Sequence, residues 1–208
     1  MRTHRRRAAL AGLAVAVALL VGMTGPAVAA PDFTGNATGQ ELTARWWQVA
    51  LFGADLSFFD DSLDGGNCRQ VDLPSGPVVL VAGTFGGASG PRACEIPVGA
   101  TLVLPVVNSI WALTDPGDSV GDAQKFFREY FADAAATATV DGDDARVRRI
   151  KSSRFLVDAT AFAEYGPLVA VSDGYWLVVR LDPGVHTVTT TGSASGFDSA
   201  TTYTFTVG

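Results

Sequence analysis

The end of the chain alternates strictly between threonine and apolar side chains. Tyr203, Phe205 and Val207 are separated by single threonines throughout the segment Thr202–Val207. Successive side chains of a β-strand point to opposite faces, so this period of two indicates a strand with one face in the core and one in water. Such a strand needs a sheet, and the rest of the sequence must supply its partners.

Turn residues divide much of the remaining sequence into further short strands. The segments Tyr175–Leu181 and Val185–Thr191 flank Asp182-Pro183-Gly184, and proline followed by glycine favours a tight turn. We therefore expect these two segments to be adjacent antiparallel partners. By the same reasoning, a second hairpin is predicted from Thr137–Val140 and Ala145–Ile150.

Two other segments, Val78–Ala82 and Thr101–Val107, are almost entirely apolar, which predicts strands buried on both faces or lying centrally in a sheet. Helical spacing is found in two places. Leu42, Trp46 and Ala50 predict an amphipathic helix over about 39–51. A second helix is predicted over about 120–135, with one apolar face formed by Phe127, Tyr130, Phe131 and Ala134.

The first thirty residues have the three parts of a secretory signal peptide. Arginines come first, the apolar run Ala8–Met23 follows, and the small residues Ala27–Ala30 end the segment. The apolar run is shorter than the roughly 20 residues that a membrane-spanning helix needs. We expect residues 1–30 to be removed as a signal peptide and residues 31–208 to form a single secreted, extracellular β-rich domain with no membrane span.

The charge balance excludes one class of partner. The whole chain has 15 basic and 21 acidic residues, and four of its arginines lie in the predicted signal peptide. The mature part therefore has a net charge of about −10, which opposes binding to nucleic acid and to anionic membranes. We expect no nucleic-acid partner.

The two cysteines, Cys68 and Cys94, are expected to form a disulfide in the oxidising compartment that secretion implies. In the chain-entropy model a bridge of this span stabilises the fold by roughly 3 kcal/mol. Short strands, frequent turns and the absence of strand–helix–strand alternation then define the fold class. We predict a mainly β protein: an antiparallel β-sandwich or jelly-roll-like domain with two decorating α-helices and one disulfide.

Several motifs carry a resemblance to a known family. They lie in the segments Gly76–Gly87, Arg92–Gly99, Leu102–Asn108, Val140–Gly142, Asp173–Trp176 and Pro183–Thr187. In this order they resemble a family of uncharacterised secreted bacterial proteins with the pattern GPVxxLAGTxGG, RxC, PxG, PVxN and DGYW…PGxHT. The resemblance implies a secreted β-rich fold, and it implies no activity, substrate or catalytic residue.

His186 is the only histidine of the predicted mature chain. Because it follows a Pro-Gly turn, we expect its ring to pack beside Val188, to bond a neighbouring carbonyl and to do no chemistry. No G-x-S-x-G segment precedes a helix, which disfavours a serine hydrolase. The glycine-rich segment 83–90 lacks the lysine and hydroxyl of a phosphate-binding loop, so we interpret it as a flexible loop.

Acidic side chains support two further hypotheses. Asp61, Asp64 and Glu95 are candidates for a pair of catalytic carboxylates in glycoside hydrolysis, because the disulfide would draw their segments together. Calcium, which prefers oxygen ligands, is a second hypothesis. Its candidate ligands are Asp61, Asp64, Asp115, Asp118 and Asp122. None of these is in EF-hand register, so we interpret them as turn and helix-cap residues and expect no cofactor or metal.

Without a catalytic constellation, the sequence favours a secreted non-catalytic module that binds a protein or glycan partner through loops at one end of the sandwich. The alternative is a secreted, carboxylate-dependent hydrolase acting on sugars, with tryptophans as stacking faces. The same tryptophans are equally well explained as core residues. They are Trp46, Trp47, Trp111 and Trp176.

Overall fold

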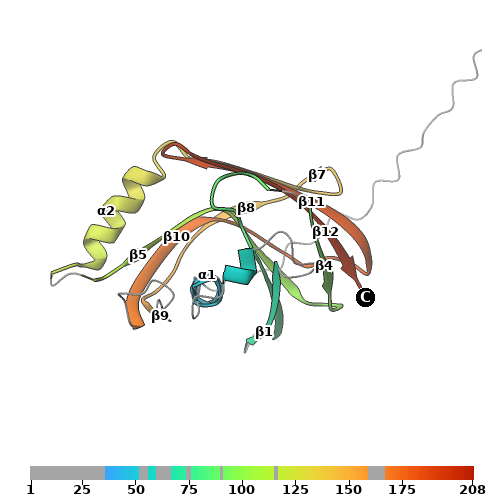
Figure 1. Cartoon of the computed structure of the whole chain (residues 1–208), viewed down its shortest axis with the longest axis horizontal. Helices are drawn as coiled ribbons and strands as arrows, with labels where there is room; N and C mark the ends of the chain where they lie inside the picture. Colours follow the sequence, from blue (N-terminus) through green and yellow to red (C-terminus); the bar gives the residue numbers. More distant parts are fainter. Residues whose placement is uncertain are drawn as a thin grey trace, which may run out of the picture.

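The computed structural model describes residues 36–51, 56–59, 67–73, 76–89, 91–114, 117–158 and 167–208. Two β-sheets face each other, and helix α1 (Asn36–Ala50) covers the outer face of one of them (Figure 1). A short 3-10 helix, η1 (Leu56–Phe59), follows α1. The predicted sandwich with two helices and one disulfide is therefore confirmed.

We call the sheet beneath α1 sheet A and the facing sheet B. Sheet A has the order β1-β2-β5-β10-β8, and β9 also pairs with β10. Its strands are β1 (Cys68–Leu73), β2 (Gly76–Val81), β5 (Thr101–Ala112), β8 (Val147–Lys151), β9 (Phe155–Asp158) and β10 (Pro167–Val179). Most pairs are antiparallel, as expected, but β2 and β5 are parallel.

Sheet B has the order β3-β12-β11-β6-β7, and β4 also pairs with β12. Its strands are β3 (Gly87–Ala88), β4 (Arg92–Ile96), β6 (Ala135–Val140), β7 (Asp143–Asp144), β11 (Gly184–Ala194) and β12 (Phe197–Val207). Both β3 and β4 run parallel to β12, so sheet B is mixed as well. The threonine alternation at the end of the chain lies on β12, where Tyr203, Phe205 and Val207 are buried.

The near-continuous apolar strands are buried on both faces, as predicted. On β2, Val79 and Val81 pack between the two sheets, whereas Val78 and Leu80 pack under α1. At Gly192 of β11 the two sheets approach too closely for a side chain at that position. A Cβ on Gly192 of β11 would lie 2.6 Å from the Val106 carbonyl oxygen of β5.

The prediction that Tyr175–Leu181 and Val185–Thr191 pair with each other is wrong. Tyr175 lies on β10 of sheet A, whereas Val185 lies on β11 of sheet B, whose partners are β6 and β12. A Pro-Gly turn reverses the chain equally well between two sheets as within one, so the turn signal alone does not decide the pairing. The predicted pairing of Thr137–Val140 with Ala145–Ile150 is also wrong for most of its second strand. Strand β6 pairs with the two-residue β7, whereas β8 (Val147–Lys151) crosses to sheet A and pairs with β10.

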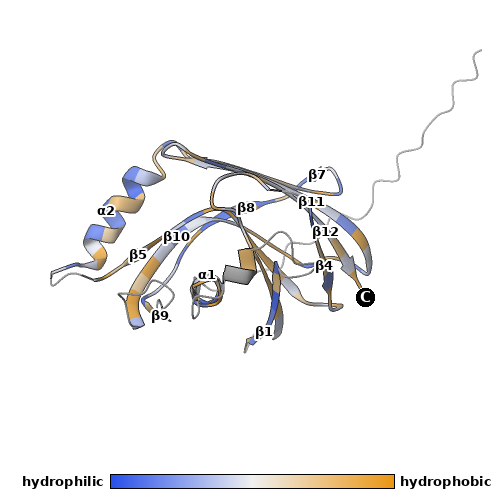
Figure 2. Cartoon of the chain, viewed as in Figure 1, coloured by the Kyte–Doolittle hydropathy of each residue, from blue (hydrophilic) through white to orange (hydrophobic). Residues whose placement is uncertain are grey.

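Both predicted helices are present with shifted ends. Helix α1 ends one residue before the predicted limit and begins at Asn36, and α2 spans Val120–Tyr130. Ser119 caps α2 in a capping box with Asp122, a signal that the hydrophobic pattern had not indicated. Figure 2 colours α2 in alternating hydrophilic and hydrophobic bands, the pattern of a helix that buries one side.

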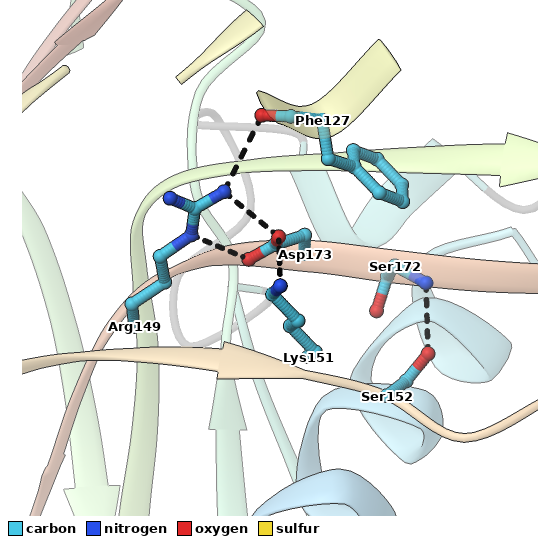
Figure 3. A network of polar contacts seen from close by, with 6 residues as sticks. All are labelled: Phe127, Arg149, Lys151, Ser152, Ser172 and Asp173. Carbon is cyan, nitrogen blue, oxygen red and sulfur yellow. Dashed lines mark hydrogen bonds and ion pairs between the residues drawn. The ribbon is translucent and has the colours of Figure 1, made fainter. Parts of the chain in front are cut away.

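An ion pair between the partly exposed Arg149 and the buried Asp173 attaches the last turn of α2 to sheet A (Figure 3). Asp173 of β10 is fully buried, and Arg149 of β8 donates to both of its carboxylate oxygens at 3.0 and 2.9 Å. The same guanidinium donates to the Phe127 carbonyl at 3.3 Å and lies over the rings of Phe131 and Tyr175. These hydrogen bonds with Asp173 raise the pKa of Arg149. The buried carboxylate is thus compensated by the residue that holds α2.

The predicted signal peptide, residues 1–30, lies outside the described residues, and the division into one domain stays a prediction. Among the helices that are described, none has the length and apolar character needed to cross a membrane.

Candidate functional site

A loop at one end of the sandwich carries the most exposed large apolar side chain of the described residues. Phe85 lies between β2 and β3 and is 73 % exposed. Its ring contacts the half-buried ring of Phe59 in η1, with 4.5 Å between ring centroids. The hydroxyl of Thr84 accepts a hydrogen bond from the amide of Gly86 at 3.2 Å, which closes the turn around Phe85. We call residues 83–88 the Phe85 loop.

The base of the Phe85 loop is held by a buried arginine. Arg92 of β4 is 4 % exposed and donates from Nη1 to the carbonyl oxygens of Ala82, at 2.7 Å, and Gly83, at 2.8 Å. The Tyr203 hydroxyl donates to the same Ala82 carbonyl, and the Ala82 amide donates to the Asn67 carbonyl, at 2.9 and 2.8 Å. Hydrogen bonds from a charged donor are the strong ones, so this end of the loop is firmly positioned.

The other end of the Phe85 loop joins sheet B. Gly87 and Ala88 form β3, which pairs with Ser199 and Ala200 of β12. Ser89 adds a backbone hydrogen bond to Ala200 at 3.1 Å and a side-chain contact with Thr201 at 3.1 Å. The sequence predicts a flexible loop here because of its glycines. The structure instead attaches both ends to strands and leaves Phe85 at the tip.

Two neighbouring turns extend this surface. Gly86 has a φ of +117°, and a Cβ at this position would lie 3.4 Å from the ring of Phe197, just beyond the β11–β12 turn. In that turn the amide of Ser195 donates to Asp133, in the turn that follows α2, at 3.2 Å. Three segments therefore lie next to one another at one end of the molecule: the Phe85 loop, the β11–β12 turn and the turn after α2. We call this end the loop end.

His186 lies at the opposite end and is occupied on both sides of its ring. Nδ1 is 2.7 Å from Oδ2 of Asp141, and Nε2 is 2.8 Å from the carbonyl oxygen of Asp182. An ionised Asp141 and a carbonyl oxygen can only accept, so this arrangement favours the protonated ring, which donates from both nitrogens. Burial lowers the pKa of His186, but these hydrogen bonds outweigh it and the pKa is raised. The predicted bond to a neighbouring carbonyl is confirmed, and the expectation that His186 does no chemistry stays a prediction.

Of the three candidate catalytic carboxylates, the structure describes Glu95 alone. Glu95 is exposed on β4, beside the Cys68–Cys94 disulfide, at a groove of about 560 Å³. Asp61 and Asp64 lie outside the described residues, so this pairing stays a prediction. The disulfide itself is confirmed, with the two Cα atoms 6.3 Å apart.

Two calcium candidates have other roles. Asp118 accepts a hydrogen bond from the Thr114 amide at 3.1 Å, and Asp122 caps α2. The Ser119 hydroxyl that bonds Asp122 lowers the pKa of this carboxyl. Asp61, Asp64 and Asp115 lie outside the described residues. The described residues contain no group of three or more His, Cys, Asp or Glu side chains that could hold a metal ion.

Two of the tryptophans proposed as sugar-stacking faces are core residues. Trp46 and Trp176 are 2 % and 0 % exposed and pack edge to face under α1, with ring centroids 5.5 Å apart. Trp46 also donates to the Val81 carbonyl at 2.8 Å. Trp47 and Trp111 are half-buried. The exposed aromatic ring of the described chain is Phe85, a residue that the sequence pattern did not single out.

No protein-family model and no curated protein matches this chain. Among solved structures, it is similar to a cysteine protease inhibitor from Entamoeba histolytica, with 11 % identity and a TM-score of 0.26 over 63 % of this chain and 95 % of that one. It is also similar to PbICP-C in complex with falcipain-2, with 8 % identity and a TM-score of 0.27 over 63 % of this chain and 98 % of that one. For Amebosin the identity is 10 % and the TM-score is 0.22, over 58 % of this chain and 97 % of that one. TM-scores this low do not establish a shared fold and carry no information about a partner.

Proposed function

We propose that this chain is a secreted, non-catalytic module that binds a protein partner through the loop end, with Phe85 as the apolar anchor. The observation that carries the proposal is the exposure of Phe85, 73 %, on a loop whose base is held by the buried Arg92. A phenylalanine in water forgoes roughly 1.5–3 kcal/mol that burial would supply. Contact with a partner would recover this free energy.

The attachment of the loop supports binding further. An interface pays for every side chain and loop that must be ordered on association, and a loop that is already positioned avoids much of that cost. In the Phe85 loop, the Arg92 hydrogen bonds fix one end and the β3–β12 pairing fixes the other. The expected counterpart is a partner with a concave apolar pocket that accepts one aromatic ring.

Protein is favoured over glycan as the partner. Phenylalanine has no polar group with which to orient a sugar hydroxyl, and two of the four tryptophans that could stack on a sugar are in the core. The burial of Trp46 and Trp176 removes two of the four stacking faces that the sugar-hydrolase alternative offered. No described observation favours that alternative specifically.

The test is a binding screen of the mature protein against arrayed extracellular proteins and glycans, repeated with Phe85→Ala. For any protein that binds, the alanine variant is expected to lose at least about tenfold in affinity, as anchors at the centre of an interface do. Val185→Ala is the matched control, since Val185 is 69 % exposed but lies at the far end of β11. An unchanged affinity for Phe85→Ala, or binding to glycans alone, contradicts the proposal.

A further inference from the structure

The Cys68–Cys94 disulfide joins the free edges of the two sheets on the side that carries the Phe85 loop. Cys68 lies on β1, the edge strand of sheet A, and Cys94 lies on β4, which pairs only with β12 in sheet B. With two cysteines in the chain, this is the only disulfide bond between the sheets. The β4–β12 ladder is parallel and spans five residues, Arg92–Ile96. Parallel pairing is slightly the weaker kind per residue, so side-chain contacts and the disulfide add to what holds the β4 edge.

Each strand joined by the disulfide also holds the base of the Phe85 loop. The residue before Cys68 is Asn67, whose carbonyl accepts from the Ala82 amide at 2.8 Å. The Asn67 side chain is 3 % exposed and donates to the Phe58 carbonyl at 3.2 Å, next to the Phe59 ring that contacts Phe85. On the sheet A side, the disulfide therefore fixes the residue to which the loop is attached.

On the sheet B side, Cys94 lies two residues after Arg92, and both side chains are buried on the same face of β4. Arg92 donates to Ala82 and Gly83. Ala82 thus donates to Asn67 beside sheet A and accepts from Arg92 of sheet B, so hydrogen bonds to opposite sheets meet at this residue. Their simultaneous geometry depends on how the two sheet edges are held together, and the disulfide is the covalent bond that holds them.

We propose that the Phe85 loop is redox-controlled: it is positioned for binding while Cys68 and Cys94 are joined and is released when they are reduced. The consequence for affinity rests on the function proposed above. The disulfide borders an open groove of about 560 Å³, and the half-buried Cys68 is its more exposed member. It is therefore accessible to a small dithiol.

The chemistry is thiol–disulfide exchange with a dithiol reductant. One thiolate of the reductant attacks Sγ of Cys68, forms a mixed disulfide and releases Cys94 as a thiolate. The second thiol of the reductant then displaces Cys68, so that the reductant leaves as its own disulfide and both cysteines end as thiols. Two electrons pass from the dithiol to the protein. In the opposite direction, oxidation after export would make the loop competent to bind.

The test is amide hydrogen exchange of the oxidised protein, of the protein reduced by dithiothreitol under native conditions, and of a Cys68→Ser/Cys94→Ser variant. In the two states that lack the disulfide, the amides of residues 84–89 are expected to exchange at least about tenfold faster than in the oxidised protein, because the attachment of the loop opens locally. The internal reference is Val188–Thr190 in the central strand β11, where exchange should change by less than about twofold. Arg92→Lys, which keeps the disulfide, should raise exchange at 84–89 as well.

Unchanged exchange at residues 84–89, or an equal increase there and in β11, overturns the inference, since the disulfide would then be either irrelevant to the loop or a support of the whole fold. Because no partner is needed, this result is independent of the proposed function. Once a partner is known, reduction should weaken its binding by about tenfold or more. If the affinity of a partner is unchanged both by Phe85→Ala and by reduction, the proposed function is contradicted, whereas the exchange result for the loop still stands.

Discussion

At the scale of single residues, His186 links two turns through a charged hydrogen bond, and this makes stability depend on pH. The pKa of His186 is raised above the ordinary histidine value of 6.5, so the contribution of this residue to stability is complete below pH 6.5 and is lost as pH rises through the folded pKa. For Asp141, burial raises the pKa, but hydrogen bonds from His186 and the Thr187 amide outweigh it and lower the pKa below 3.8. Its contribution is therefore lost only in acid.

We predict that His186→Ala lowers the free energy of unfolding by about 1 kcal/mol at pH 5.5 and by less at pH 8.5. For a chain of this size, about 1 kcal/mol corresponds to about 2–4 °C in melting temperature. Thermal unfolding at the two pH values measures the difference, and Asp141→Asn should reproduce it. A loss that is equal at both pH values would show that the imidazolium is not the stabilising form.

At the scale of elements, α2 depends on the ion pair between Arg149 and the buried Asp173. Arg149→Met would leave a fully buried carboxylate whose one remaining cationic neighbour among the described residues is Lys151, 4.0 Å away. We predict a loss of about 3 kcal/mol in the free energy of unfolding, the low end for a broken buried ion pair, because Arg149 is itself 31 % exposed. Urea denaturation measures the loss. Arg148→Met, one residue earlier on β8, is the control and should cost much less.

A loss no larger than that of the control would mean that the aromatic packing of α2 carries its attachment alone. The pair also illustrates a limit of sequence reasoning. The apolar face of α2, with Phe127 and Phe131 buried, follows from helical spacing. The ion pair does not, because β8 and β10 meet only after the chain has crossed from sheet B to sheet A.

At the scale of the whole molecule, local signals predicted the strands, and long-range pairing decided their sheets. The alternation around Phe205 and the apolar segment of β2 identified buried faces correctly, since burial pattern is a local property of a strand. The turn at Pro183 could not show that it joins two sheets. Likewise, the glycines around Phe85 indicated a flexible loop. The hydrogen bonds from Arg92 that hold the loop could not be predicted, because Arg92 lies on a separate strand.

In the function proposed above, the loop end is the surface that binds a protein partner. The most direct measurement is the NMR chemical-shift change of backbone amides when the partner found in the screen is added. We predict that the changes concentrate in residues 83–88 and in the β11–β12 turn at 195–197. Changes concentrated instead at the opposite end, around residues 97–100 and 182–186, would contradict the claim.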